Sequence, residues 1–214
     1  ARDLGPQGFD QRYGHGLVLG KFYTLHAGHS ALIRTAVQAC ERVTVQLLAN
    51  LAETIPLEVR KHWLTTEHPD VHVVADWDDL PVDFDDPVIW DGHMKVIESL
   101  LDSPVDAVFT SDDYGAELAR RLRAQWVQVD PGRVRTPVSG TAVRADPARY
   151  WWALAPVVRQ WYARRIVVLG AESTGTTTLA EALAERLGAP WVPEYGRAYT
   201  EERPGGLDAP WRSE

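Results

Sequence analysis

Cysteine is almost absent from this chain of 214 residues, because Cys40 is the only one. A lone thiol excludes an intrachain disulfide and favours a reducing compartment. Long apolar runs are also absent, so no segment suits a membrane span and the first residues lack the apolar core of a secretion signal. We therefore expect a cytoplasmic protein with no membrane partner.

An excess of positive charge is missing as well. The chain has 22 Lys and Arg against 30 Asp and Glu, which gives a net charge of −8 at pH 7. That balance argues against a nucleic-acid partner. The 45% apolar and 24% charged residues are ordinary for a globular protein, and the length suits one full α/β domain and part of another.

Short segments rich in valine or leucine alternate with helical stretches along most of the chain. This alternation predicts right-handed βαβ units and an α/β fold with a Rossmann-like doubly wound parallel sheet. Ligands of such sheets bind at the carboxyl ends of the strands. The expected strands are 16–20, 43–48, 71–75, 105–109 and 126–129, and the expected helices are 28–40, 56–67, 87–101 and 113–123.

The most informative segment is 16–29, in which an apolar strand runs into Gly20 and Lys21 and two histidines open a helix. A helix N-terminus offers free N–H groups and a dipole that favours bound anions. His26 and His29 therefore predict a site for the phosphate chain of a nucleoside triphosphate. The alternatives for this pair are helix capping or metal binding, and a metal would need a third ligand.

This segment resembles the HxGH signature of the nucleotidyltransferase superfamily, whose members transfer a nucleoside monophosphate from ATP or CTP to a phosphate or related acceptor. Thr24 stands where a proline is common, so the loop loses a fixed φ but no charged group. Segment 136–144 resembles the second signature of that superfamily, ISSTxxR, in its ISGTxxR form, and would close the nucleotide site. The resemblance implies four catalytic residues, Lys21, His26, His29 and Arg144, and an ATP site made of Gly20, Lys21, Phe22, His26, Gly28, His29, Ser139, Gly140, Thr141 and Arg144.

A second phosphate motif follows a domain boundary that we place at about residue 164. An expected strand at 166–169 leads into a loop that matches G-x-x-x-x-G-K-[ST], except that Thr176 occupies the lysine position. The missing ammonium would normally reach the β- and γ-phosphates, although backbone N–H groups can still cradle phosphate. About fifty residues remain, too few for a full P-loop kinase core. The P-loop candidates are Gly170, Glu172, Ser173, Gly175, Thr176 and Thr177.

The two signatures and the second phosphate motif occur together with a D-P-A-R-Y-W segment at 146–151 and an E-Y-G-R tetrad at 194–197. In this combination the chain resembles one family. That family is the bifunctional nicotinamide mononucleotide adenylyltransferase/ribosylnicotinamide kinase family (NadR-type). The expected organisation is a flexible arm (1–15), a nucleotidyltransferase domain (16–164) and a partial P-loop kinase-like domain (165–214). The resemblance implies ATP, nicotinamide mononucleotide and NAD as ligands, Mg²⁺ arriving with ATP and no metal site of the protein's own, and self-association.

The acceptor side is less specific. Segment 86–93 resembles the family's tryptophan-bearing loop, so Trp90 either stacks on the nicotinamide ring or packs a helix onto the sheet. Thr110, Ser111 and Tyr114 follow the fourth strand and are further acceptor-binding candidates. Both signatures also suit another acceptor, namely phosphopantetheine, nicotinate mononucleotide, or a sugar or polyol phosphate. A non-catalytic nucleotide sensor is the alternative from a different class.

Overall fold

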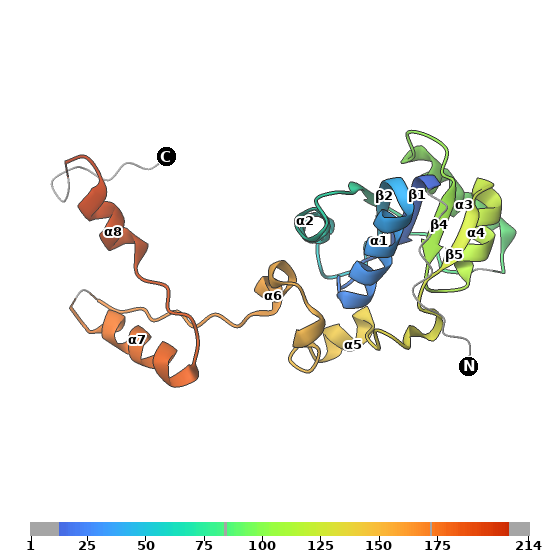
Figure 1. The fold of residues 1–214 in the computed structure, drawn as a ribbon. Helices are drawn as coiled ribbons and strands as arrows, with labels where there is room; N and C mark the ends of the chain where they lie inside the picture. Colours follow the sequence, from blue (N-terminus) through green and yellow to red (C-terminus); the bar gives the residue numbers. More distant parts are fainter. Residues whose placement is uncertain (1–12, 84, 172, 206–214) are drawn as a thin grey trace. The chain divides into compact units, whose positions relative to one another are not determined.

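The computed structural model describes residues 13–83, 85–171 and 173–205 (Figure 1). The chain divides into two compact units, Ala1–Ala163 and Arg164–Glu214, which we call the first and second unit. The boundary predicted from the sequence lies one residue further along the chain. Within the described residues, none of the helices is long and apolar enough to cross a membrane.

A five-stranded parallel sheet with the order β3-β2-β1-β4-β5 organises the first unit. Because the order reverses between β1 and β4, the sheet is doubly wound, as predicted, and its ligand crevice lies at the carboxyl ends of those two strands. The strands are β1 (Tyr13–Gly20), β2 (Cys40–Ala49), β3 (His72–Trp77), β4 (Ala107–Thr110) and β5 (Gln125–Gln128). The crossover helices are α1 (Ala27–Ala39), α2 (Leu57–Glu67), α3 (Pro87–Ser99) and α4 (Tyr114–Leu122).

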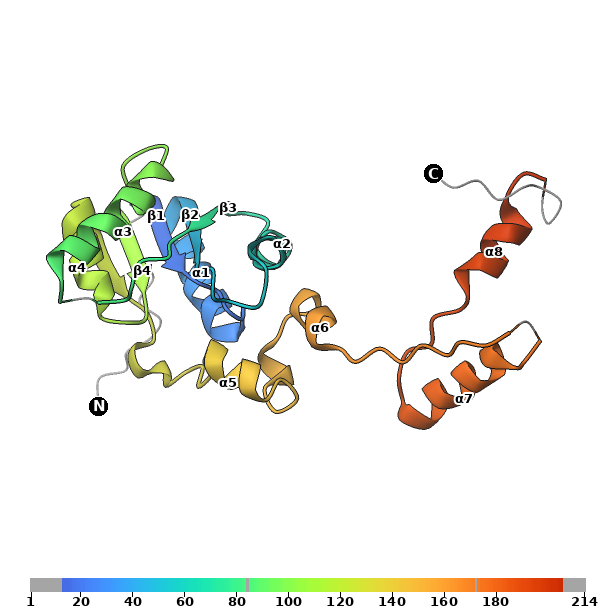
Figure 2. The same cartoon turned by 180° about the vertical axis from the view of Figure 1, so that it is seen from behind.

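Helices cover both faces of this sheet. Successive residues of β1 point to opposite sides, so Val18 packs in one core with α1 and α2 while Leu17 packs in another with α3 and α4. Figures 1 and 2 show the first unit from opposite sides, with α1 and α2 labelled beside one part of the sheet and α3 and α4 beside the other. Each fully buried Leu or Ile side chain in these cores contributes about 1.5–3 kcal/mol.

The segment after β5 adds short helices to the α1–α2 side of the first unit. These are η1 (Pro131–Arg133), α5 (Gly140–Ala145), η2 (Trp151–Ala153) and α6 (Pro156–Tyr162). Val143 of α5 and Val158 of α6 are fully buried in the same core as α1 and α2. The segment that carries the second signature is therefore fixed to the helix that carries the first.

The predicted flexible arm, residues 1–15, extends too far, because its last three residues belong to β1. The strand begins at Tyr13, three residues before its expected start, so residues 13–15 are ordered, and residues 1–12 lie outside the described part. The signal was hidden because His15 is a buried polar residue in the strand. Its ring nitrogens meet the carbonyl oxygen of Pro104 and the hydroxyl of Thr44, each at 2.9 Å, which satisfies the polar groups that burial would otherwise leave unpaired.

The second unit contains α7 (Thr176–Leu187) and α8 (Tyr195–Glu202). The expected strand at 166–169 is not formed, which corrects the prediction from its apolar sequence. The described residues of this unit contain no strand that could pair with it, and a strand is stable only when its backbone groups are paired. Ile166, Val167 and Leu169 are consequently 66%, 72% and 87% exposed.

Candidate active site

The first candidate site lies where β1 ends and α1 begins. Gly20 closes the strand, and His26 is the N-cap of α1, where its Nδ1 accepts a hydrogen bond from the Gly28 N–H at 3.2 Å. Phe22 adopts φ 44°, in the left-handed region, which costs about 1–3 kcal/mol for a residue other than glycine. That turn directs the buried Phe22 ring edge-on to His29, with ring centroids 5.1 Å apart.

The two motif histidines are stacked, with ring centroids 3.8 Å apart and ring planes 24° apart. Burial lowers the pKa of His26 to about 4, and the nearby Arg133 acts in the same direction. Burial and the neighbouring His26 lower the pKa of His29 well below its usual value. Both rings are therefore neutral at pH 7. Nδ1 of His26 accepts from Gly28, so its proton is on Nε2, which can donate a hydrogen bond to an anion. The single N–H of the neutral His29 ring is directed to the Thr24 backbone, a hydrogen bond that acts to raise the pKa against the effect of burial.

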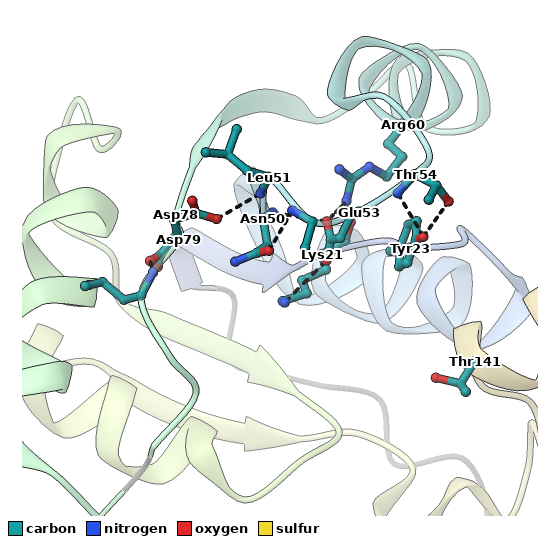
Figure 3. Close-up of polar contacts among 12 residues, drawn as sticks. Lys21, Tyr23, Asn50, Leu51, Glu53, Thr54, Arg60, Asp78, Asp79 and Thr141 are labelled. Carbon is teal, nitrogen blue, oxygen red and sulfur yellow. Dashed lines mark hydrogen bonds and ion pairs between the residues drawn. The ribbon is translucent and has the colours of Figure 1, made fainter.

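Lys21, whose side chain is half exposed, lies at the end of β1 beside the buried ion pair of Glu53 and Arg60. Its Nζ lies 3.3 Å from Glu53, and the other oxygen of that carboxylate accepts a hydrogen bond from Arg60 Nη1 at 2.6 Å. The same Nη1 donates to the Lys21 carbonyl oxygen at 2.9 Å. Figure 3 shows Arg60 reaching down toward Glu53, with Lys21 below that carboxylate. These contacts fix the backbone of Lys21 and place its ammonium beside Glu53.

The second signature packs directly on the first. Ser139 is the N-cap of α5 and accepts a hydrogen bond from the Ala142 N–H at 3.2 Å. A Cβ on Gly140 would lie only 2.4 Å from the Tyr23 carbonyl oxygen, so glycine is what lets α5 approach this loop. The Arg144 guanidinium carbon lies 3.9 Å from the centroid of the Tyr23 ring. Two motifs more than a hundred residues apart in the sequence thus form one site.

Four buried nitrogens of this site have no hydrogen-bond partner among the described residues. They are Nδ1 of His29, Nη1 of Arg144, and Nε and Nη2 of Arg60. The other terminal nitrogen of Arg144, Nη2, donates to the Thr141 hydroxyl at 3.2 Å. Unsatisfied buried polar groups are uncommon and often mark a place for a ligand. A phosphate chain supplies the acceptors that an unpartnered guanidinium N–H needs.

Among the described residues, no group of three or more His, Cys, Asp or Glu side chains is placed to hold a metal ion. Metal binding by the histidine pair stays an untested alternative. The capping alternative holds for His26, whose side chain caps α1. His29 stands in the first turn and has no capping role.

A cavity of about 180 Å³ opens next to the phosphate site, on the α3–α4 side of the sheet. Trp90 and Tyr114, two of the predicted acceptor-binding residues, line it together with Gly20 and Lys21. Trp90 is 4% exposed, and the Tyr114 hydroxyl donates to the Leu19 carbonyl oxygen at 3.1 Å. The lining is completed by Leu19, Leu48, Asp78, Leu80, Val82, His93 and Ile97. An apolar slot with a few polar groups suits a flat heterocycle.

The other two acceptor candidates lie outside the lining of this cavity. Thr110 is buried, and its hydroxyl donates to the Asp112 carbonyl oxygen at 2.9 Å and accepts from Trp126 Nε1 at 2.8 Å. The Ser111 carbonyl oxygen accepts from Gln128 Nε2 at 3.4 Å. Thr110 joins β4 to β5 and α4, and a ligand-binding role for these two residues stays a prediction.

Sequence reasoning missed the pair of Asp78 and His93 in the cavity wall. The acidic loop that contains Asp78 reads as a solvated face, yet the side chain of Asp78 is only 7% exposed and lies 2.5 Å from His93 Nδ1. Nε2 of His93 lies 3.2 Å from the Pro81 carbonyl oxygen. No spacing in the sequence links a loop aspartate to a helix residue fifteen positions on. The two meet where Leu80 of the loop lies close against Gly92 of α3.

The second phosphate motif forms a loop before α7. Gly175 is the N-cap with φ 81°, Ser173 has φ 66°, and Thr176 is the first residue of the helix. Glu172 lies outside the described residues. Gly170 and Thr177 keep their predicted positions at the loop start and in the first helical turn, and none of the described residues of α7 is buried.

Comparisons with known proteins agree with these motifs. A family model described as an AAA domain matches residues 165–213, where the P-loop segment was predicted. The chain is 27% identical over 228 residues to the trifunctional NAD biosynthesis/regulator protein NadR of Escherichia coli K12, covering 96% of this chain and 54% of that protein. The NadR of Salmonella typhimurium is also 27% identical, over 89% of this chain and 51% of that protein. The chain thus spans about half the length of the curated relatives that it matches.

Solved structures show the same fold. A crystal structure of NadR protein in complex with NAD and AMP-PNP has a TM-score of 0.68 at 24% identity, covering 89% of this chain and 58% of that one. A structure of NadR protein in complex with NR has a TM-score of 0.66 at 23% identity, covering 90% and 57%. The resemblance to NadR-type proteins and the predicted fold class are confirmed.

Proposed function

We propose that the first unit is an adenylyltransferase that joins ATP and nicotinamide mononucleotide to give NAD and pyrophosphate. The observation that carries this proposal is the direct packing of Gly140 and Arg144 on the loop of Tyr23, which brings both signatures together around a buried, unpartnered N–H of Arg144. The NAD-biosynthesis proteins to which the chain is similar supply the substrate class.

The chemistry is an in-line displacement at the α-phosphorus of ATP. A phosphate oxygen of the mononucleotide attacks that phosphorus, the bond to the bridging oxygen of the β-phosphate breaks, and pyrophosphate leaves with the electron pair. The attacking oxygen is already ionised at pH 7, so no general base is needed. Catalysis then consists of alignment of two anions and stabilisation of the charge that develops on the leaving group.

The residues of the site divide these tasks. His26 and His29 contact the triphosphate from one side, with His26 donating from its Nε2, and Arg144, Ser139 and Thr141 approach it from the closing segment. Lys21 borders both the phosphate site and the cavity, so its ammonium is positioned to neutralise the two reacting phosphates. Mg²⁺ would enter with ATP and offset the charge of the triphosphate.

The acceptor occupies the cavity beside Lys21. Its nicotinamide ring lies against Trp90, whose indole face is electron-rich and suits an electron-poor ring, and the mononucleotide phosphate extends toward Gly20 and Lys21. Gly20 and Lys21 line the cavity and also border the phosphate site. An acceptor bound in the cavity can therefore place its phosphate next to the α-phosphorus of ATP.

The second unit contributes no kinase activity in this proposal. The lysine that would contact the transferred phosphate is replaced by Thr176, and the segment before the loop is exposed. We expect no phosphoryl transfer from ATP to ribosylnicotinamide. Self-association of the chain stays a prediction.

A coupled assay tests the acceptor. The full chain is incubated with ATP, Mg²⁺ and, in separate reactions, nicotinamide mononucleotide, nicotinate mononucleotide, phosphopantetheine or a polyol phosphate, and pyrophosphate is measured. We expect the highest kcat/KM with nicotinamide mononucleotide. Turnover with another acceptor alone would reassign the substrate, and nucleotide binding without any turnover would favour the sensor.

A further inference from the structure

Tyr23 stands between the two signatures at a position that the first motif leaves open. Two guanidinium groups lie over its ring, with the central carbon of Arg144 at 3.9 Å from the ring centroid and that of Arg60 at 5.3 Å. Its hydroxyl is fixed by Thr54, whose Oγ1 lies 2.8 Å away and whose N–H donates to it at 3.0 Å (Figure 3). The ring is therefore anchored on the α2 side while its face meets Arg144.

Arg144 and Lys21, the two cations assigned to the phosphates, are held in different ways. Lys21 is paired with Glu53, a carboxylate that offsets part of its charge. No carboxylate forms an ion pair with Arg144 within the described ranges. Its contacts are the Tyr23 ring and the Thr141 hydroxyl, and its Nη1 is buried without a partner.

We propose that Tyr23 is a positioning residue, which holds the Arg144 guanidinium against its ring so that the N–H edge stays available to the triphosphate. This inference rests on the proposed function. A guanidinium stacks on an aromatic ring through its face and donates hydrogen bonds through its edge, so one group can do both at once. A carboxylate in place of the ring would occupy the same N–H groups that the phosphate needs.

The geometry also explains why an ordered ring is useful at this point. Arg144 lies in the last turn of α5, a helix of six residues, and its long side chain has many rotamers. Fixing such a side chain costs conformational entropy each time a ligand binds. Tyr23 orders the guanidinium before ATP arrives, and preorganisation of this kind raises affinity without a new ligand contact.

A double-mutant cycle tests the inference with α,β-methylene ATP as the binding probe and adenylyl transfer as the kinetic readout. The variants are Tyr23→Leu, Tyr23→Phe, Arg144→Ala and the double variant Tyr23→Leu/Arg144→Ala. We expect Tyr23→Leu to raise the Kd for the probe and the KM for ATP about tenfold. Tyr23→Phe keeps the ring and should stay within about twofold of the parent, and the KM for nicotinamide mononucleotide should be unchanged in both.

The cycle separates positioning from direct contact. In the Arg144→Ala background, Tyr23→Leu should add less than about twofold, because the group that it positions is already gone. Additive losses would mean that Tyr23 acts on the ligand itself, and equal losses in the Leu and Phe variants would assign the effect to the hydroxyl and Thr54. Either result overturns the inference, as does a Tyr23→Leu variant with parental Kd. Thermal unfolding of each variant checks that the fold is retained.

The outcomes for the inference and for the proposed function are distinguishable. If the parent binds the probe but does not adenylylate nicotinamide mononucleotide, the proposed function fails while the binding cycle still decides the role of Tyr23. If the parent does not bind the probe at all, both fail.

Discussion

The chain carries two glycine-containing loops, each placed after an apolar segment and before a helix, and they differ in their surroundings. The loop before α1 follows β1, whose Leu17 and Val18 are fully buried in a five-stranded sheet. The loop before α7 follows residues 166–169, which form no strand and are exposed. The first loop is packed against a second segment, since a Cβ on Gly140 would meet the Tyr23 carbonyl oxygen.

This difference shows that the affinity of a phosphate motif for an anion depends on how rigidly the surrounding structure holds its loop. Backbone N–H groups bind an anion strongly when they are already fixed, because ligand binding then costs little ordering entropy. In the first unit, paired strands and the buried Glu53 and Arg60 supply that rigidity. In the second unit, none of the described residues of α7 is buried.

The largest effect is expected from His29→Ala in the first loop. The substitution removes a motif imidazole from the phosphate site together with its stacking on His26, and loss of one preorganised polar group lowers kcat by about 10²–10³. Steady-state rates of NAD formation measure it, with circular dichroism to verify folding. The matched control is Thr176→Ala in the second loop, which should leave the rate unchanged. Near-normal turnover of His29→Ala would remove the catalytic assignment.

Acidification should weaken the first unit through the same histidines. Burial lowers the pKa of His26 from 6.5 to about 4 in the folded chain. Between these two pH values the unfolded chain is protonated at His26 and the folded chain is not. Stability is therefore full above pH 6.5 and falls as the pH drops toward 4, by about 3 kcal/mol for this residue. Urea unfolding between pH 4.5 and 7 measures the slope.

The control for this pH dependence is His26→Asn. Asparagine is a good N-cap and does not titrate, so the helix keeps its cap while the slope assigned to His26 disappears. If stability still depended on pH to the same extent in this variant, His26 would have the same pKa in the folded and unfolded chain, and the assignment would be wrong.

The elements of the first unit could be predicted closely because their periodicity is local. The expected helix 56–67 is α2 at Leu57–Glu67, and the expected strand 126–129 is β5 at Gln125–Gln128. The apolar segment 166–169 was wrongly assigned, because strand formation depends on partners that a local pattern does not reveal.

The candidate site was only partly predictable for the same reason. The two signatures predict His29, Lys21 and Arg144 as site residues, because these are motif positions. The residues that hold them, Glu53 and Tyr23, have no motif position, and their roles follow from contacts between α2, α5 and the end of β1. Such contacts are made by tertiary packing, so sequence spacing gives no signal for them.

A smaller effect is expected when the two signatures are pushed apart by Gly140→Ala. The new Cβ would lie 2.4 Å from the Tyr23 carbonyl oxygen, a distance that real Cβ atoms do not adopt, so α5 must move away. We expect the KM for ATP to rise about tenfold, because a displacement of about 1 Å misaligns a preorganised site. Gly196→Ala in α8 is the matched control, since its Cβ would be 3.9 Å from the nearest atom, Glu194 Oε1. Equal kinetics in the two variants would show that the contact does not matter.

The smallest effect is expected from Thr176→Lys, which restores the P-loop lysine in the second unit. Phosphoryl transfer depends on positioning and on electrostatic stabilisation, so an ammonium on an exposed loop without paired strands cannot align two substrates. Adenylyl transfer should stay within about twofold of the parent, and no phosphate should pass from ATP to ribosylnicotinamide. The reciprocal variant, Lys21→Thr, should lower adenylyl transfer at least tenfold, because it removes a cation that Glu53 and Arg60 hold in place. Kinase activity in Thr176→Lys would show that one side chain, and not the exposure of residues 166–169, is what separates the two loops.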